Sequence, residues 1–257
     1  MTPGEPATER LQETGGDPRL PSYALVELTW REVSRALARD PRLVFPVGAL
    51  EQHGPHLPLG TNTFIAGRMA DDLSRELGIL RAPTFPYGVG LPIHQPFPGT
   101  ATLRRKTFHR AVNELLAGWE DDGFREFIIL TAHRYEPHLD ALLMALTTES
   151  LTTVVDLYAI DVSDIITTTP EAEHGGEVET SLLLHLDPSR VRRGQIADYV
   201  PDPGTLRKYV RGRVPTPPPD SQGAVGRPSL ASAEKGRLIY GRYLDGVRKA
   251  IVERQAE

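Results

Sequence analysis

Short apolar runs alternate with helical patterns along this chain. Apolar runs of strand length, bounded by polar or turn-forming residues, predict buried β-strands. Strands are predicted at residues 42–47, 79–82, 127–130 and 153–160.

The segments between these runs carry helix signals. Thr29 and Glu32 fit a capping box that begins a helix extending to about residue 39. Apolar residues at helical spacing predict a helix over 64–77, which ends at Gly78. Further helices are predicted at residues 107–123, 138–146, 177–186 and 231–252. This alternation of strands and helices predicts an α/β fold, a three-layer α/β/α sandwich with a mostly parallel central sheet.

The remaining segments have the composition of loops. Residues 1–20 are rich in Pro, Gly, Glu and Thr and predict a disordered tail. Residues 83–100 and 211–230 are dense in Pro and Gly and predict long loops. Because no internal repeat or linker is apparent, residues 21–257 are predicted to form a single domain.

Composition excludes several classes of function. The 257 residues are 39% apolar and 25% charged, as in an ordinary globular protein. A net charge of −5 without a strong basic block disfavours nucleic acid and anionic membranes, so the expected partner is a small molecule. No membrane-spanning run or signal peptide is recognisable, so a cytoplasmic location is expected. Because cysteine is absent, any metal must be held by His, Asp or Glu, which suits zinc, manganese or iron.

Acidic residues and histidines gather in three places. Residues 51–62 read EQHGPHLPLGTN directly after the first predicted strand, and His133 follows the strand at 127–130. Residues 171–179 add four acids and His174 at a loop-to-helix junction. Open α/β sheets bind ligands at the carboxyl ends of their strands, so these clusters are expected to meet there and to hold a metal ion.

The other histidines have simpler interpretations. His56 lies near two prolines and is predicted to be structural, as are the helical residues His109, His138 and His185. His94 belongs to the Pro-rich loop and either lines a pocket or braces that loop.

Together, the three clusters resemble the creatininase (creatinine amidohydrolase) family. The most specific blocks are residues 51–62 and residues 174–181, which read HGGEVETS. Weaker similarity covers residues 86–88, His94, residues 97–100, His133 and residues 226–236. The resemblance implies a layered α/β/α amidohydrolase, often hexameric, that cuts C–N bonds in cyclic amides or formamides. Family metal centres commonly hold two divalent ions.

By position, the resemblance places His174 at a proton-transfer site and assigns the metal ligands. The positions that match family ligands are Glu51, His53, Asn62, His133 and Glu179. Asn62 stands where the family has an Asp that bridges two ions. A carboxamide has one good acceptor oxygen and no charge, so it bridges two cations poorly. We therefore expect one divalent ion rather than two.

The loop after His133 also departs from the family pattern. Arg134 is expected to point outward or to hold an anionic substrate. Tyr135 and His94 are further predicted substrate contacts. Glu136 is predicted to supply a replacement catalytic carboxylate, although Pro137 favours an extended geometry at that turn.

These features favour a metal-dependent amidohydrolase that acts on a small cyclic amide or formamide. Two alternatives stay open: a biosynthetic member with altered chemistry, and a catalytically retired scaffold that assembles as a homo-oligomer. The chain lacks the glycine fingerprint of dinucleotide-binding proteins and the Gly-x-Ser-x-Gly elbow of serine hydrolases, which disfavours both.

Overall fold

The computed structural model describes residues 20, 22–145, 149–168, 173–201 and 219–254. Within these ranges, four parallel strands form one sheet in the order β2-β1-β3-β4. The strands are β1 (Arg42–Val47), β2 (Leu80–Arg81), β3 (Glu126–Thr131) and β4 (Leu151–Asp156). Because all four run in the same direction, their carboxyl ends lie at one edge of the sheet. The predicted tail, apart from Leu20, and residues 211–218 of the predicted loop lie outside the described residues.

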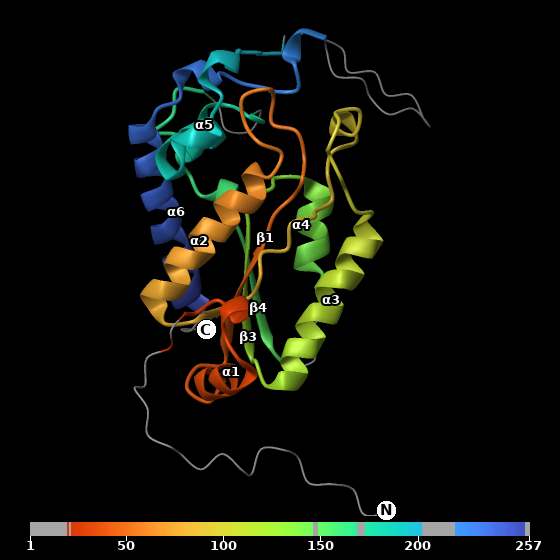
Figure 1. Cartoon of the computed structure of the whole chain (residues 1–257), viewed down its shortest axis with the longest axis vertical. Helices are drawn as coiled ribbons and strands as arrows, with labels where there is room; N and C mark the ends of the chain where they lie inside the picture. Colours follow the sequence, from red (N-terminus) through yellow and green to blue (C-terminus); the bar gives the residue numbers. More distant parts are fainter. Residues whose placement is uncertain (1–19, 21, 146–148, 169–172, 202–218, 255–257) are drawn as a thin grey trace, which may run out of the picture.

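Helices cover both faces of this sheet and complete the predicted three layers. Figure 1 shows α2, α5 and α6 on one side and α3 and α4 on the other. The α-helices are α1 (Trp30–Leu37), α2 (Thr61–Leu77), α3 (Arg105–Asp122), α4 (Glu136–Leu143), α5 (Glu177–Leu186) and α6 (Ala233–Arg254). Short 3-10 helices occur at Leu25–Glu27, Pro92–His94, Leu157–Ala159, Pro188–Arg190, Arg193–Gln195, Pro219–Ser221 and Pro228–Leu230.

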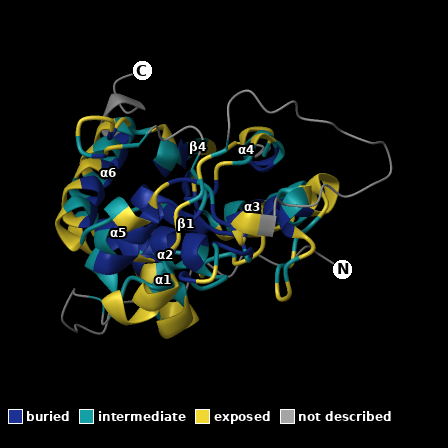
Figure 2. Ribbon diagram, turned by 90° about the horizontal axis from the view of Figure 1, so that it is seen from above, coloured by how far each residue is buried: buried dark blue, intermediate teal, exposed yellow. Residues whose placement is uncertain are grey.

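Alternate residues of the central strands belong to two separate hydrophobic cores, because successive side chains of a strand point to opposite faces of the sheet. Val44 and Ile128 pack with α2, α5 and α6, around Met69, Leu183 and Tyr243. On the other face, Phe45 and Phe127 belong to a second core with the apolar stripe of α3. Figure 2 shows these buried segments between the exposed outer surfaces of the helices. Burial on both faces explains why the strands are near-continuous apolar runs.

The predicted signals at helix ends are confirmed. The Thr29 side chain accepts a hydrogen bond from the N–H of Glu32, whose carboxylate accepts the N–H of Thr29 at 2.7 Å. Gly78 ends α2 with a φ of 69°, a backbone region that glycine enters without steric cost.

Three helices begin earlier than predicted, among them α3, which begins at Arg105 rather than Thr107. Helix α2 begins at Thr61 rather than Phe64, so Asn62 lies in its first turn and is buried. Helix α4 begins at Glu136 rather than His138. Pro137 occupies the first turn of α4, where the missing N–H costs no hydrogen bond, and the predicted extended geometry at Glu136 is therefore wrong.

Strand β4 is shorter than the strand predicted at residues 153–160. It ends at Asp156, whose side chain accepts the N–H of Tyr158 and so begins the 3-10 helix Leu157–Ala159. This turn directs Tyr158 toward the carboxyl edge of the sheet. No helix among the described residues has the length and apolar character needed to cross a membrane.

Candidate metal centre

The loop between β1 and α2 places three polar side chains in the interior. Glu51, His53 and Asn62 are 1%, 0% and 1% exposed. The backbone carbonyl of Glu51 lies 2.9 Å from Nδ1 of His53, and a carbonyl only accepts, so this nitrogen carries the hydrogen. When neutral, the His53 ring therefore presents the lone pair of Nε2 to the interior.

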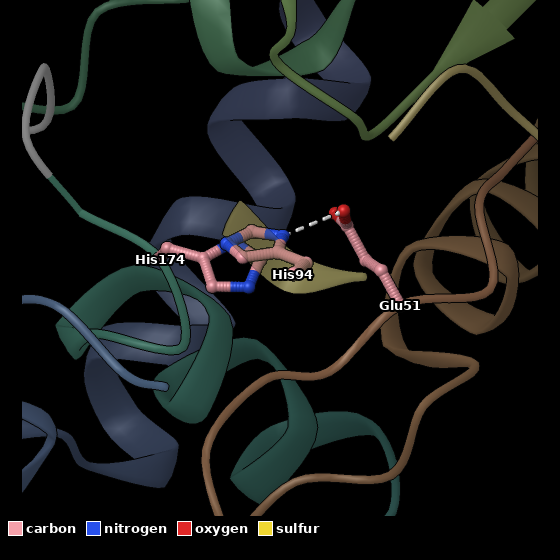
Figure 3. A group of neighbouring side chains, drawn as sticks. All are labelled: Glu51, His94 and His174. Carbon is pink, nitrogen blue, oxygen red and sulfur yellow. Dashed lines mark hydrogen bonds and ion pairs between the residues drawn. The ribbon is translucent and has the colours of Figure 1, made fainter. Parts of the chain in front are cut away.

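The Glu51 carboxylate lies between two imidazoles. Its Oε1 is 2.8 Å from Nδ1 of His133, and its Oε2 is 3.0 Å from Nδ1 of His94. Burial opposes the charge of Glu51, but His133 and His94 keep its pKa well below the ordinary value. His94, left open between two roles by the sequence, thus contacts a predicted metal ligand; Figure 3 shows this contact.

His133 follows β3 and is fixed from behind by the backbone. Its Nε2 donates to the carbonyl of Val89 at 2.8 Å, which leaves Nδ1 facing Glu51 and Asn62. Burial opposes protonation of His133, but Glu51 raises its pKa. The ring of His138 packs edge-on against His133, with centroids 4.8 Å apart.

The Asn62 amide joins the two halves of the cluster. Its Nδ2 lies 2.9 Å from Oε1 of Glu51 and 3.2 Å from Nδ1 of His133. Its Oδ1 lies 3.0 Å from Nε2 of His53. The amide hydrogens therefore face Glu51 and His133, whereas the carbonyl oxygen faces His53.

Helix α5 brings Glu179 to the same point. Glu179 Oε1 lies 3.4 Å from Nε2 of His53 and accepts the Tyr158 hydroxyl at 2.9 Å, and Oε2 accepts the N–H of Gly175 at 2.6 Å. Burial opposes the charge of Glu179, but His53 outweighs it and lowers the pKa to about 2. Reciprocally, burial opposes the charge of His53, but Glu179 raises its pKa to about 9. Glu177 instead pairs with Lys235, so only one of the two acids reaches the centre, as expected.

His174 lies between the two predicted ligand groups. Its ring stacks on His53 and His94 at centroid distances of 4.5 and 4.1 Å, and Nε2 donates to the carbonyl of Gln52 at 2.5 Å. Figure 3 shows the stack of His174 on His94 beside Glu51. Burial and the neighbouring His53 lower the pKa of His174 to about 3, so the ring is neutral.

Gly175 permits this close approach. Its φ is 62°, and an added Cβ would lie 2.7 Å from the carbonyl oxygen of His53. A larger residue would push His174 away from the cluster.

Two overlapping sets of side chains have the spacing that a cation requires. One potential ligand atom from each of Glu51, His94 and His174 lies within 4.8 Å of the others. The same holds for His53, His174 and Glu179. The structure thus brings together all five predicted ligands, and it adds His94 and His174 at the edge of the cluster.

The cluster opens onto a pocket. Among the described residues, the lining comprises Glu51, Asn62, Leu91, His133, Arg134, Tyr158, Val162, Glu173, His174, Val178, Glu179 and Tyr243. Arg134 therefore reaches the pocket and does not fill the space between the ligands. Glu136, in contrast, is exposed at the start of α4 and does not belong to this lining. Tyr135 also lies outside the lining, but its ring packs beside the ring of His133, with centroids 6.4 Å apart.

Sequence reasoning missed three polar residues of the pocket. Tyr158 comes from the turn after β4, Tyr243 from α6, and Glu173 from the segment before α5. Glu173 alone had a signal, since it lies next to His174 in the acidic run. The two tyrosines have no motif around them, and only the packing of α6 and β4 brings them to the centre.

Comparison with known proteins agrees with this geometry. The family model described as creatinine amidohydrolase matches residues 26–251. A creatinine amidohydrolase of Pseudomonas putida is 29% identical over 255 residues, covering 88% of this chain and 95% of that protein. A mycofactocin precursor peptide peptidase of Mycobacterium tuberculosis is 30% identical over 231 residues, covering 82% of this chain and 85% of that protein.

Solved structures share the fold over nearly the whole chain. A manganese form of creatininase has a TM-score of 0.78 and covers 91% of this chain and 98% of its own. A variant form of Zn-Zn type has a TM-score of 0.76 and covers 91% and 99%. Both are 27% identical to this chain. The chain therefore belongs to the creatininase (creatinine amidohydrolase) family, whose members are hydrolases that act on C–N bonds.

Proposed function

We propose that this protein is a metal-dependent amidohydrolase that uses a single divalent ion to cleave a C–N bond in a small cyclic amide or formamide. His53, Asn62 and Glu179 would hold the ion. The observation that carries the proposal is the orientation of the Asn62 amide, which makes the two halves of the cluster chemically different.

The His53 half contains acceptors that point at one another. Nε2 of neutral His53 presents a lone pair, and it faces Oδ1 of Asn62 at 3.0 Å and Oε1 of Glu179 at 3.4 Å. Two buried oxygens that face the same nitrogen lone pair repel it unless a proton or a cation lies between them. In the metal-free protein a proton on His53 meets this need, since its pKa is about 9. A divalent ion would replace that proton.

The Glu51 half already has its donor. The Asn62 NH₂ group faces Oε1 of Glu51 at 2.9 Å. Nδ1 of His133 lies 2.8 Å from the same oxygen and donates to it when protonated, a form that Glu51 favours by raising the pKa of His133. The amide hydrogens therefore stand where a second cation would have to bind. An Asp at this position would supply another acceptor and a negative charge instead, which explains why the substitution favours one ion over two.

Zinc, manganese or iron suits this donor set of imidazole and oxygen ligands. The manganese and Zn-Zn forms of related creatininases support the first two choices. A bound ion would polarise the amide carbonyl of the substrate and make a water molecule more acidic.

His174 is positioned for the proton transfer that C–N cleavage requires. Its Nε2–H is held by the carbonyl of Gln52, which leaves Nδ1 as the acceptor of the neutral ring. Nδ1 would take the proton that the attacking water gives up and deliver it to the leaving nitrogen. His94 stacks on the His174 ring and is itself held by a hydrogen bond with Glu51, which helps to fix the orientation of His174.

The substrate class is supported by the relatives of this chain. Creatinine, the substrate that the Pseudomonas putida relative is named for, supports a small cyclic amide, whereas the peptidase relative supports a peptide bond as the second candidate. Homo-oligomeric assembly and a cytoplasmic location belong to the same proposal. A catalytically retired scaffold is disfavoured, because it would not require the buried acceptors of His53 and Glu179. A well-packed apolar pair at these positions would stabilise such a scaffold better.

Metal analysis and hydrolysis assays test this function. Protein purified without chelators and dialysed against zinc or manganese should bind close to one ion per chain, and this form should release amine from a panel of cyclic amides, formamides and dipeptides. Glu179→Gln should lose both the ion and the activity, while Glu177→Gln, a matched change two residues earlier at a carboxylate that pairs with Lys235, should keep the ion. Two tightly bound ions would overturn the single-ion centre, and a metal-loaded protein inert toward the whole panel would overturn the hydrolase.

A further inference from the structure

We propose that the substrate carries an oxyanion group, a carboxylate or a phosphate, which Arg134 binds at the wall of the pocket. This inference rests on the proposed function, because it names the substrate class of the same site. Four observations on Arg134 and its neighbours carry it.

The first is the free hydrogen-bonding capacity of Arg134. Its side chain is 39% exposed and lines the pocket directly after the predicted ligand His133. Among the described residues its one charged partner is Asp156, with Nε and Oδ2 3.8 Å apart, which is beyond hydrogen-bond distance. A guanidinium has five N–H donors in a planar fork that matches a carboxylate or a phosphate.

The second observation explains why Asp156 leaves these donors free. Oδ1 of Asp156 accepts the N–H of Tyr158 at 3.0 Å and caps the 3-10 helix after β4. This role holds the carboxylate in place, so it lies close enough to Arg134 to attract it without forming a bidentate pair. An oxyanion can therefore bind the guanidinium of Arg134 without first displacing a hydrogen-bonded partner.

The third observation is a neighbouring hydroxyl. Tyr243 extends from α6 into the pocket lining, where the charge of Arg134 acts on its phenol. Burial raises the pKa of Tyr243, so the phenol remains a neutral donor. Arg134 and Tyr243 together offer a charged fork and an O–H group to one ligand.

The fourth observation is the charge of the rest of the lining. Apart from Arg134, its charged residues are carboxylates and histidines, and the carboxylate of Glu173 is occupied by Thr168 and by the N–H groups of Glu177 and Val178. The carboxylates of this lining repel an anionic group, and among its described residues Arg134 alone carries a fixed positive charge. A substrate with one oxyanion group would thus be oriented, with the amide toward the metal ligands and the anion toward the guanidinium.

Matched pairs of formamides test the inference by calorimetric titration. N-formylglycine and N-methylformamide differ by a carboxylate, and 2-formamidoethyl phosphate and 2-formamidoethanol differ by a phosphate. In at least one pair the anionic member should bind about ten-fold or more tightly, as expected for a charge-assisted contact. The pair that shows the larger ratio identifies the source of the oxyanion.

Because an anion can also bind a metal ion, variants of Arg134 and Asp156 are needed to show that the binding ratio depends on Arg134. Arg134→Gln should reduce the ratio to about three-fold or less, and Arg134→Lys should restore part of it. Asp156→Asn keeps the cap on Tyr158 but removes the competing charge, so it should increase the ratio. The effects should appear in both metal-free and metal-loaded protein, because Arg134 is not a ligand of the ion.

The outcomes separate this inference from the proposed function. If the metal-loaded Arg134→Gln variant shows the same binding ratios as the metal-loaded unaltered protein, the oxyanion site alone is overturned. Absence of metal binding, with the Arg134-dependent ratio retained, would overturn the metal centre alone. Equal binding of both members of both pairs by the unaltered protein would also overturn the inference.

Discussion

The hydroxyl of Tyr158 donates a hydrogen bond to Oε1 of Glu179 at 2.9 Å, so a residue from the turn after β4 orients a predicted metal ligand on α5. The same oxygen faces Nε2 of His53 at 3.4 Å. Partners of this kind fix the direction of the ligand lone pairs and increase metal affinity.

Tyr158→Phe should therefore weaken metal binding by about ten-fold or more, as is typical when such a partner is lost. The dissociation constant can be measured by competition with a chromogenic chelator. Tyr240→Phe is the matched control, because it removes a hydrogen bond from Tyr240 to Asp72, a residue outside the pocket lining. Equal losses of affinity in both variants would show that Tyr158 acts through general stability instead.

Asn62→Asp should convert the single-ion centre into one that holds a second ion. The change replaces the NH₂ group that faces Glu51 and His133 with a carboxylate oxygen, which can accept a cation but cannot satisfy those acceptors. The metal content of the variant should rise from about one to about two ions per chain, measured by atomic absorption after dialysis against zinc or manganese. A content that stays at one would show that the Glu51 half does not take a cation.

The fold was largely predictable because its strands are buried on both faces. Arg42–Val47 is found as predicted, since the continuous apolar run of five residues from Leu43 to Val47 has few other interpretations. The order of the strands was not predictable, because pairing between distant segments leaves no local signal. The start of α2 was missed for a related reason: Thr61 and Asn62 are polar, and only their tertiary burial marks them as helical.

The centre was predictable where its ligands lie within a motif. Residues 51–62 and 174–181 supply Glu51, His53, Asn62 and Glu179, and the structure brings all four together with His133. Glu136 was chosen because a carboxylate near His133 could replace a missing one. The structure places it on the outer surface, because α4 begins there and turns its first residue toward solvent.

His138→Phe should destabilise the protein by about 1–3 kcal/mol, the cost of leaving buried polar groups without partners. Nδ1 of His138 accepts the N–H of Val89 at 3.3 Å, and Nε2 lies 3.1 Å from the hydroxyl of Thr131. Burial keeps the pKa of His138 well below its ordinary value, so the ring is neutral and can accept. Urea denaturation of the metal-free protein measures the loss.

The same variant separates stability from metal binding. The carbonyl of Val89 also fixes His133, but His133 belongs to the half of the cluster in which Asn62 and the His133 proton face Glu51, and not to the half proposed to hold the ion. Metal affinity should therefore change less in His138→Phe than in Tyr158→Phe. A larger loss of affinity in His138→Phe would place the ion on the His133 side.

Metal binding should release about one proton per ion near pH 7.5, because the ion replaces the proton that His53 shares with Glu179. The pKa of His53 is raised to about 9 by Glu179 against the effect of burial, whereas that of Glu179 is lowered to about 2. Below pH 9 the proton occupies the site, so apparent affinity should rise about ten-fold per pH unit and level off above pH 9.

Calorimetry in two buffers with different ionisation enthalpies counts the released protons directly. Release of about one proton at pH 7.5, falling toward zero above pH 9, fits displacement of the His53 proton. Affinity that is independent of pH between 6 and 8 would mean that His53 is already neutral in the metal-free protein. Some other group would then have to separate the acceptor atoms of His53, Asn62 and Glu179. The assignment of the ion to these three residues would fail.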